Sequence, residues 1–147
     1  MKRALALLIC AIFLVTGLIR VGVSLVVIGE LQGWWVFGGE AAQAVAETRE
    51  FIAQAPTNFA GFTPLTYFAF LLFMGAVVSL GALAQVWRRG WGMALIGLYL
   101  ACHSFLFVNF MTINPKIGLV ALAAALAGIL IWANGADRNR PNPALAA

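Results

Sequence analysis

Residues 91–132 read WGMALIGLYLACHSFLFVNFMTINPKIGLVALAAALAGILIW, and this stretch decides the fold. It holds two apolar runs, 91–112 and 117–133, on either side of a short turn around Asn114, Pro115 and Lys116. Each run is close to the ~20 apolar residues that a helix needs to cross ~30 Å of hydrocarbon. Proline ends a helix because it lacks a backbone N–H and disfavours helix in the residue before it. The stretch therefore predicts a transmembrane hairpin.

The composition of the 147 residues is that of a membrane protein. The chain is 63% hydrophobic and 10% charged, with a mean hydropathy of +0.97, whereas soluble domains are about 45–50% apolar and about 25% charged. The net charge is +4, but the basic residues lie at the ends of apolar runs and form no basic face. We therefore expect the lipid bilayer as a partner and no nucleic acid.

Two further apolar runs precede the hairpin. Residues 4–29 follow a charged start, and because no small-residue cleavage pattern ends the run, we interpret it as an uncleaved first span. Residues 64–87 form the next run. Thr63 is a good helix N-cap and Pro64 suits the first helical position, so a helix is expected to start there.

The composition changes between residues 30 and 62. Gln43, Glu47, Glu50 and Gln54 recur at spacings of four, three and four residues, which places them in one polar stripe on a helix. This pattern predicts a short amphipathic helix over 41–55, ended by Pro56. At the other end of the chain, residues 134–147 are polar and rich in proline, so a disordered cytoplasmic tail is expected.

The predicted fold is an all-α membrane protein. Four transmembrane helices, over 4–29, 64–87, 91–112 and 117–133, form an antiparallel bundle within a single domain of residues 1–133, and the amphipathic helix lies in the first external loop. Helix contacts are expected at small-residue spacings, which are Gly75/Ser79, Gly97/Ala101 and Ala124/Gly128.

The distribution of basic residues predicts the orientation. Cytoplasmic loops are enriched in lysine and arginine. One side of the four-span arrangement would carry Lys2, Arg3, Arg88, Arg89, Arg138 and Arg140, and the other only Arg49 and Lys116. Both termini are therefore expected in the cytoplasm, in a bacterial-type inner (plasma) membrane.

Arg20 is the most informative single residue, because it lies only about four residues, or roughly 5 Å, from the middle of the first span. A central arginine costs ~2.5–3.5 kcal/mol on insertion scales. Thr16 and Ser24 share its helical face, and in the third span Tyr99 and His103 reach a similar depth. No acidic residue lies in any of the four runs. The five residues therefore form either a site for an anionic group or a polar network that fixes helix packing.

Residues for known chemistry are missing from this pattern. The chain has one histidine, so bis-histidine haem is excluded, and Cys10 and Cys102 form no Cys-x-x-Cys pair. We expect no catalytic residue, metal or cofactor.

The sequence predicts a non-enzymatic accessory or interaction subunit of a membrane complex, with a protein partner or a homo-oligomer. The alternative is a small binding or transport protein for an anionic or quinone-like ligand, held by Arg20, Tyr99 and His103.

Overall fold

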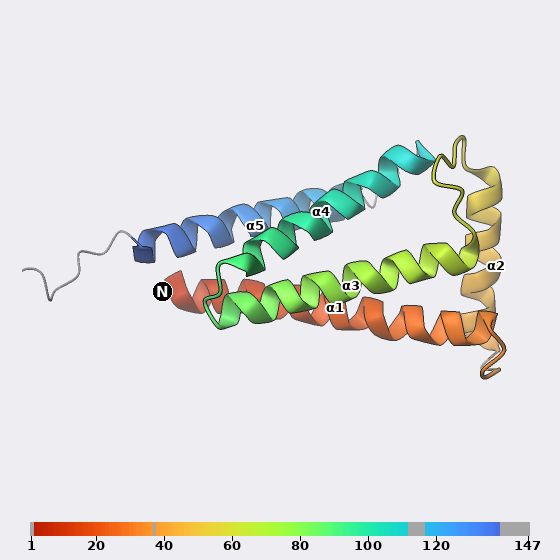
Figure 1. The fold of residues 1–147 in the computed structure, drawn as a ribbon, viewed down its shortest axis with the longest axis horizontal. Coiled ribbons are helices and arrows are strands. Elements are labelled where there is room, and N and C mark those ends of the chain that lie inside the picture. The colour runs from red at the N-terminus through yellow and green to blue at the C-terminus, as the bar shows by residue number, and fades with distance from the viewer. Residues whose placement is uncertain (1, 37, 112–116, 139–147) are drawn as a thin grey trace, which may run out of the picture.

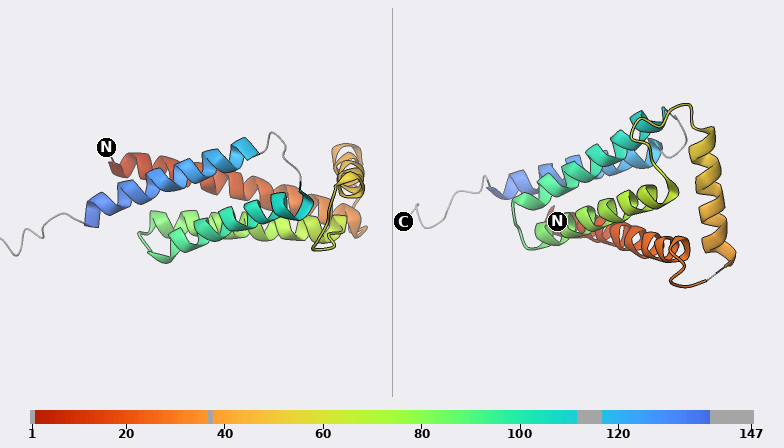
Figure 2. Two further views of the ribbon diagram at one scale, coloured as in Figure 1. Left: turned by 90° about the horizontal axis from the view of Figure 1, so that it is seen from above. Right: turned by 45° about the vertical axis from the view of Figure 1, so that its right-hand side comes forward.

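The computed structural model describes residues 2–36, 38–111 and 117–138, which form five helices and no strand. In chain order these are α1 (Lys2–Leu31), α2 (Gly39–Gln54), α3 (Pro64–Val86), α4 (Trp91–Phe110) and α5 (Ile117–Arg138). Helices α1, α3, α4 and α5 run side by side in alternating directions, and α2 crosses one end of this group (Figure 1, Figure 2). The start of α1 and the last turns of α5 lie at the opposite end.

Three of these helices, α1, α3 and α4, are long and apolar enough to cross a membrane. The apolar part of α5, Ile117–Ala133, is shorter. Large apolar side chains on the outside of the bundle are more than half exposed, including Leu8, Val15, Ile19, Val108, Leu119 and Ile131. An outer surface of this kind is suited to lipid rather than to water. The all-helical, membrane-compatible class predicted from the sequence is confirmed at this level.

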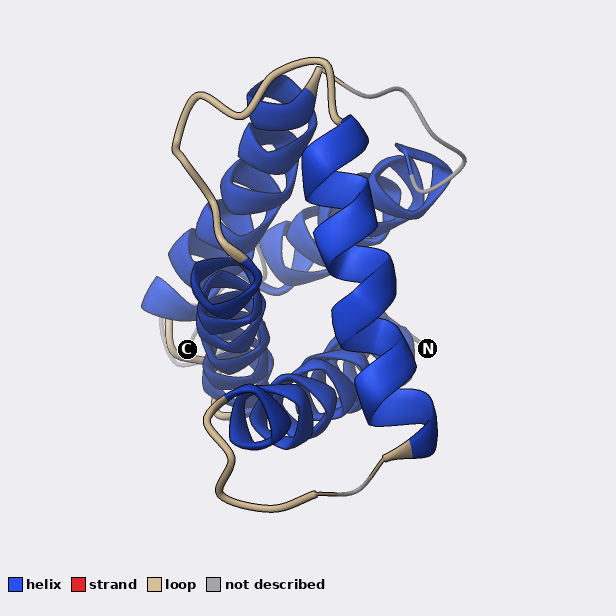
Figure 3. Cartoon of the chain, turned by 90° about the vertical axis from the view of Figure 1, so that its right-hand side faces the viewer, coloured by secondary structure: helices blue, strands red, loops and turns tan. Residues whose placement is uncertain are grey.

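The four long helices form a closed ring. Helix α1 packs most extensively on α3, α3 packs on α4, and α5 contacts both α1 and α4. Viewed along the bundle, α2 lies over the end of the ring (Figure 3), where it contacts α1 and α3. The core between the helices includes Phe13, Met74, Val78, Ile96 and Leu130, all at most 3% exposed. Helices α1 and α3 each touch three other helices, so the contact between them sets most of the arrangement.

Helices α1 and α3 approach most closely at Gly17 and Gly75. A Cβ built on Gly17 would stand 2.8 Å from the carbonyl oxygen of Gly75, and a Cβ on Gly75 would stand 2.8 Å from that of Gly17. The two backbones can come this close only because neither residue has a side chain. Of the predicted small-residue spacings, Gly75/Ser79 lies in this contact. A Cβ on Gly97 or Gly128 meets no atom within 4 Å.

The helix ends follow local sequence signals. Helix α3 begins as predicted, because Thr63 and Thr66 form a reciprocal capping box and Pro64 occupies the first turn. Helices α1 and α3 both end in the Schellman motif, in which a residue with positive φ follows the C-cap. That residue is Gly33 in α1, with φ 69°, and Arg88 in α3, with φ 58°. The motif's bonds run from Trp34 N to Gly29 O, Gly33 N to Glu30 O, Arg89 N to Ala84 O, and Arg88 N to Gln85 O.

Trp35 folds back onto the last turns of α1. Its indole N–H donates to the carbonyl oxygen of Val26 at 3.1 Å. The indole ring fills the space beside Gly29, where a Cβ would overlap with it. Gly29 therefore provides the gap that lets a tryptophan lie flat against this end of the helix.

Two predicted boundaries differ from the structure. The helix predicted over 41–55 is observed as Gly39–Gln54, because the backbone of Ala55, before Pro56, is already extended. The tail predicted to be disordered from residue 134 is helical as far as Arg138. Extending an existing helix adds one hydrogen bond for each residue fixed, so polar residues can continue it without a core. Residues 139–147 and the turn around Asn114 to Lys116 lie outside the described residues.

The Gly17 contact predicts a difference between two substitutions on the same helix. Gly17→Ala should destabilise the fold by about 1–3 kcal/mol, because the new methyl group forces α1 away from α3. Gly22→Ala should be neutral or stabilising by up to ~1 kcal/mol, because a Cβ there meets no atom within 4 Å. Unfolding of the purified chain in mixed micelles, followed by circular dichroism, measures both. Equal effects would mean that α1 and α3 do not meet at Gly17.

Candidate functional site

Arg20 lies on the buried stripe of α1, which consists of Phe13, Gly17, Ser24 and Val27 at helical spacing. Arg20 itself is half-buried. A Cβ built on Gly75 would stand 3.0 Å from the Cβ of Arg20. The missing side chain of Gly75 therefore makes room for the base of Arg20 against α3.

The guanidinium of Arg20 reaches from α1 to α4. Its Cζ lies 5.5 Å from the centre of the Tyr99 ring, within the distance of a cation–π interaction. Tyr99 is 4% exposed, so the ring gives the cation an interior partner. The charge also acts on the phenol of Tyr67, in the first turn of α3. Sequence reasoning missed Tyr67, because nothing in its spacing connects it with Arg20.

His103 lies on the same side of α4 as Tyr99, one turn further on. The two rings are 5.5 Å apart in an edge-to-face arrangement, and His103 stacks on Phe107 at 6.2 Å. His103 is 9% exposed, and its Nδ1 is buried. Tyr99 thus contacts both Arg20 and His103, and the structure joins the three residues through the tyrosine ring.

The two remaining predicted site residues differ in their placement. Ser24 is 1% exposed and faces the interior with Arg20. Thr16 is exposed on the outside of α1, because it lies at the edge of the buried stripe. The structure therefore brings Arg20, Tyr99, His103 and Ser24 to the inner side of the helices and leaves Thr16 on the outer side.

A buried serine lies beside this cluster at the closest point between α1 and α3. The Oγ of Ser79 is buried and has no hydrogen-bond partner within the described part of the chain. It occupies the position that a Cβ on Gly17 would need. A small side chain is required there, and the serine provides it together with a hydroxyl aimed at the backbone of α1.

A second polar group, at the α2 end of the bundle, was not predicted as a unit. Asn109 is 1% exposed, and its Nδ2 donates to Asn58 Oδ1 at 3.2 Å. The side-chain oxygen of Asn109 accepts from Ala60 N at 2.7 Å, and its carbonyl accepts from Thr57 Oγ1 at 3.0 Å. These bonds fasten the connection between α2 and α3 to the last turn of α4.

Aromatic rings surround this attachment. Phe62 lies at their centre, with ring-centre distances of 5.5 Å to Phe70 and 5.8 Å to Phe110. Phe51 of α2 meets Phe110 edge-on at 4.9 Å. The α2 end of the ring is therefore packed with aromatic side chains from three helices, and the Arg20 cluster lies deeper in the bundle.

The Arg20 cluster offers one cation, the phenol of Tyr99 and the imidazole of His103, and no nucleophile with an adjacent base. The four apolar runs contain no aspartate or glutamate that could pair with Arg20. Within residues 2–36, 38–111 and 117–138, no group of three histidine, cysteine or acidic residues is placed to hold a metal ion. What the cluster can do chemically is hold an anionic or hydrogen-bond-accepting group.

Comparison with protein-family models, with curated proteins and with solved structures gives no match. The site is therefore interpreted from its own geometry.

The cation–π contact predicts coupling between Arg20 and Tyr99. In a double-mutant cycle of Arg20→Leu and Tyr99→Leu, we expect a coupling of about 1 kcal/mol, within the ~0.5–2 kcal/mol range of such contacts. A cycle with Tyr99→Phe should show almost none, because phenylalanine keeps the ring face that the guanidinium contacts. Unfolding free energies in mixed micelles supply the values. Additivity in the leucine cycle would contradict the contact.

Proposed function

We propose that the chain is an inner-membrane protein with four spans, formed by α1, α3, α4 and α5. The apolar part of α5, Ile117–Ala133, would extend for about 25 Å at 1.5 Å per residue, near the lower limit for a span. Support comes from its position beside α1 and α4. Helix α2 would then lie at the outer surface, with its glutamate stripe in water, and both termini would be cytoplasmic.

Topology can be tested by cysteine labelling in a background where Cys10 and Cys102 are replaced by alanine. A membrane-impermeant maleimide should label Gln43→Cys in intact cells. It should label Arg89→Cys only after the membrane is permeabilised, because the basic ends of the helices remain in the cytoplasm. Labelling of both positions from the same side would contradict the four-span arrangement.

We further propose that the protein is a non-enzymatic accessory or interaction subunit of a membrane complex. The observation that carries this proposal is Arg20, a half-buried cation on an apolar helix. Its guanidinium contacts the ring of Tyr99, and the four apolar runs contain no carboxylate. An arginine facing lipid costs ~2.5–3.5 kcal/mol. A carboxylate from a partner would offset that cost.

The outer side of α1 shows where such a partner could approach. Thr16 is exposed one turn before Arg20, so a polar edge borders the cation on an otherwise apolar surface. A second copy of this chain would bring no carboxylate in its apolar runs. The need for a carboxylate counter-ion to Arg20 therefore favours a different protein as the partner over a second copy of this chain.

A second candidate function follows from the inner side of the same cation. Because Arg20 reaches Tyr99 inside the ring, and Ser24 and His103 face inward beside it, an anionic or quinone-like ligand could be bound there. In this alternative the protein is a small binding or transport protein. The anionic group beside Arg20 then comes from a bound ligand, whereas in the first proposal it comes from a partner protein.

Purification in mild detergent separates the two functions. An accessory subunit should co-purify in fixed stoichiometry with a partner, and Arg20→Leu should reduce the recovered partner by at least about tenfold, which corresponds to ~1.4 kcal/mol. Arg49→Leu removes the same charge from α2 and should leave recovery unchanged. A binding protein would instead purify without a partner and carry a small molecule that both Arg20→Leu and Tyr99→Leu release. Unchanged recovery of a partner with Arg20→Leu, and no bound molecule, would contradict both.

A further inference from the structure

A basic pocket lies at the opposite end of the bundle from α2, between α1, α3 and α5. We use the name basic pocket for the hollow lined by Lys2, Arg3, Ala6, Leu7, Cys10, Gln85, Val86, Arg88, Leu130 and Ala133. Three of its residues are cationic, and none is an aspartate or a glutamate. It is distant from the Arg20 cluster and plays no part in the function proposed above.

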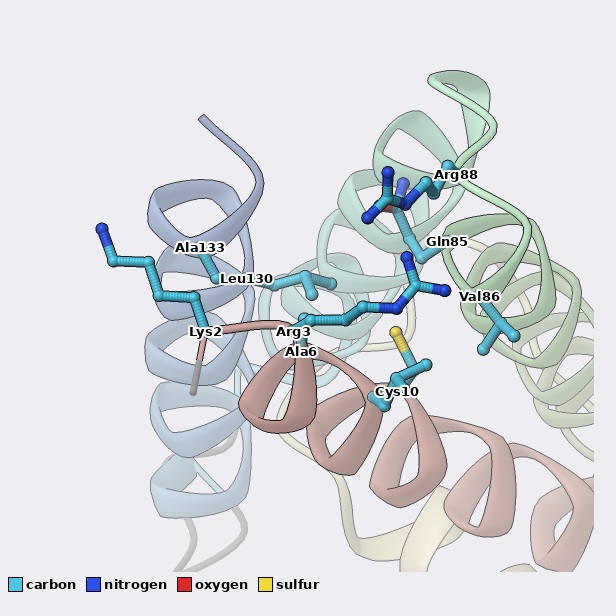
Figure 4. A pocket seen from close by; sticks show the side chains of 10 residues that line it. Lys2, Arg3, Ala6, Cys10, Gln85, Val86, Arg88, Leu130 and Ala133 are labelled. Atoms are coloured by element: carbon cyan, nitrogen blue, oxygen red, sulfur yellow. The ribbon is translucent and has the colours of Figure 1, made fainter. Parts of the chain in front are cut away.

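Two guanidinium groups from different helices gather in this pocket. Arg3 extends from α1 and Arg88 from the end of α3, and both reach towards the side-chain amide of Gln85 (Figure 4). Lys2 turns the other way, with its ammonium 4.5 Å from the centre of the Trp132 ring. Arg3 and Arg88 present two positive charges to one pocket, and both would attract an anionic group placed there.

The backbone of Arg88 gives an independent indication. In the Schellman motif the residue with positive φ is usually glycine, because a Cβ there costs roughly 1–2 kcal/mol. Helix α1 uses Gly33 in this position, whereas α3 uses Arg88 with φ 58°. Non-glycine residues keep such a conformation where the surrounding structure holds them, as Met111 does at the end of α4 with φ 48°, and they are concentrated at ligand-binding sites. Arg88 also interacts within the chain, but a guanidinium has five N–H donors and can bind a ligand as well.

The size and the rim of the pocket narrow the class of ligand. Its volume is about 30 Å³, which is room for two or three water molecules at the ~10–15 Å³ that each needs in a cavity. A small anionic group can enter this space, and the rest of a larger ligand stays outside. Leu7 and Val86 line the pocket and are also 40% and 37% exposed, so the rim is apolar. A charged head next to apolar chains is the pattern of a phospholipid.

We propose that the basic pocket binds a phosphate group, supplied by an anionic phospholipid of the leaflet at this end of the bundle. The two guanidinium groups would hold the phosphate oxygens in forked hydrogen bonds, and the acyl chains would lie along the apolar faces of α1 and α3. Basic pockets between membrane helices on the cytoplasmic side are a known setting for such head groups.

Native mass spectrometry of the purified full chain can test the proposal, with dioleoylphosphatidylglycerol, dioleoylphosphatidylcholine and inorganic phosphate as separate probes. The phosphatidylglycerol should bind at least about tenfold more tightly than the phosphatidylcholine. Each arginine near a membrane surface contributes about fivefold, so Arg88→Gln should weaken phosphatidylglycerol binding by about fivefold and Arg3→Gln with Arg88→Gln by about 25-fold.

Arg89→Gln is the matched control, because it removes the same charge from the neighbouring residue, which does not line the pocket. It should change phosphatidylglycerol binding by less than about twofold. Arg88→Gly should raise the unfolding temperature in lipid-free detergent, because it relieves the positive φ, while it loses as much binding as Arg88→Gln. That combination would show that lost binding does not come from unfolding.

Three results would overturn the proposal. Equal binding of the two lipids would mean that the charge of the head group is not recognised. An equal loss with Arg89→Gln would mean that general surface charge, not the pocket, attracts the lipid. If inorganic phosphate bound as tightly as phosphatidylglycerol, the pocket would still be a phosphate site, but the proposal that a phospholipid supplies the phosphate would be overturned.

Discussion

The contact between the backbones at Gly17 and Gly75 is the constraint on which the rest of the structure depends. In lipid there is no hydrophobic force between helices, so close packing of small residues must hold them together. Here the carbonyl oxygen of each glycine lies 2.8 Å from where the Cβ of the other would be, which is too close for a side chain. Helix α3 also contacts α4 and α2. The position of the glycine contact along α3 therefore sets where those two helices join the bundle.

The same crossing determines where the intramembrane cation lies. Arg20 follows Gly17 by one turn, and the base of its side chain rests against Gly75. If the two helices were further apart, the guanidinium would lose the support of α3 and the reach to Tyr99. The cost of an arginine in an apolar layer is thus partly offset by packing against α3 and by the ring of Tyr99. The closest contact between α1 and α3 and the base of Arg20 therefore both depend on Gly75.

Much of the architecture was predictable, because hydropathy and capping act locally. The apolar runs identified the long helices, and Thr63 with Pro64 located the start of α3. Depth alone placed His103 at the level of Arg20, with Tyr99 one turn away, but it did not indicate that the guanidinium contacts the ring of Tyr99. The rotation of α1 about its own axis could not be predicted, because a helix that is apolar nearly all round gives no signal for the side it buries. Spacing predicts that Thr16 shares the helical face of Arg20, whereas the structure leaves Thr16 exposed on the outside of α1.

Contacts between segments that are far apart in the sequence could not be predicted either. Asn58 and Asn109 are separated by 51 residues, and no periodicity relates them. Each asparagine alone suggests a turn or a cap, and only the fold shows that they fasten a loop to a helix end. The same holds for Tyr67, whose relation to Arg20 depends on how α1 and α3 cross. Composition predicts which segments enter the membrane, but it does not predict which side chains meet there.

The fold of Trp35 onto Gly29 bears on how the protein would respond to bilayer thickness. Helix α1 has 30 residues and is about 45 Å long, well above the ~30 Å of a hydrocarbon core. Tryptophan favours the headgroup level, so in a bilayer the indole held against Gly29 would anchor one end of α1 there, and tilt of the helix would take up the excess length.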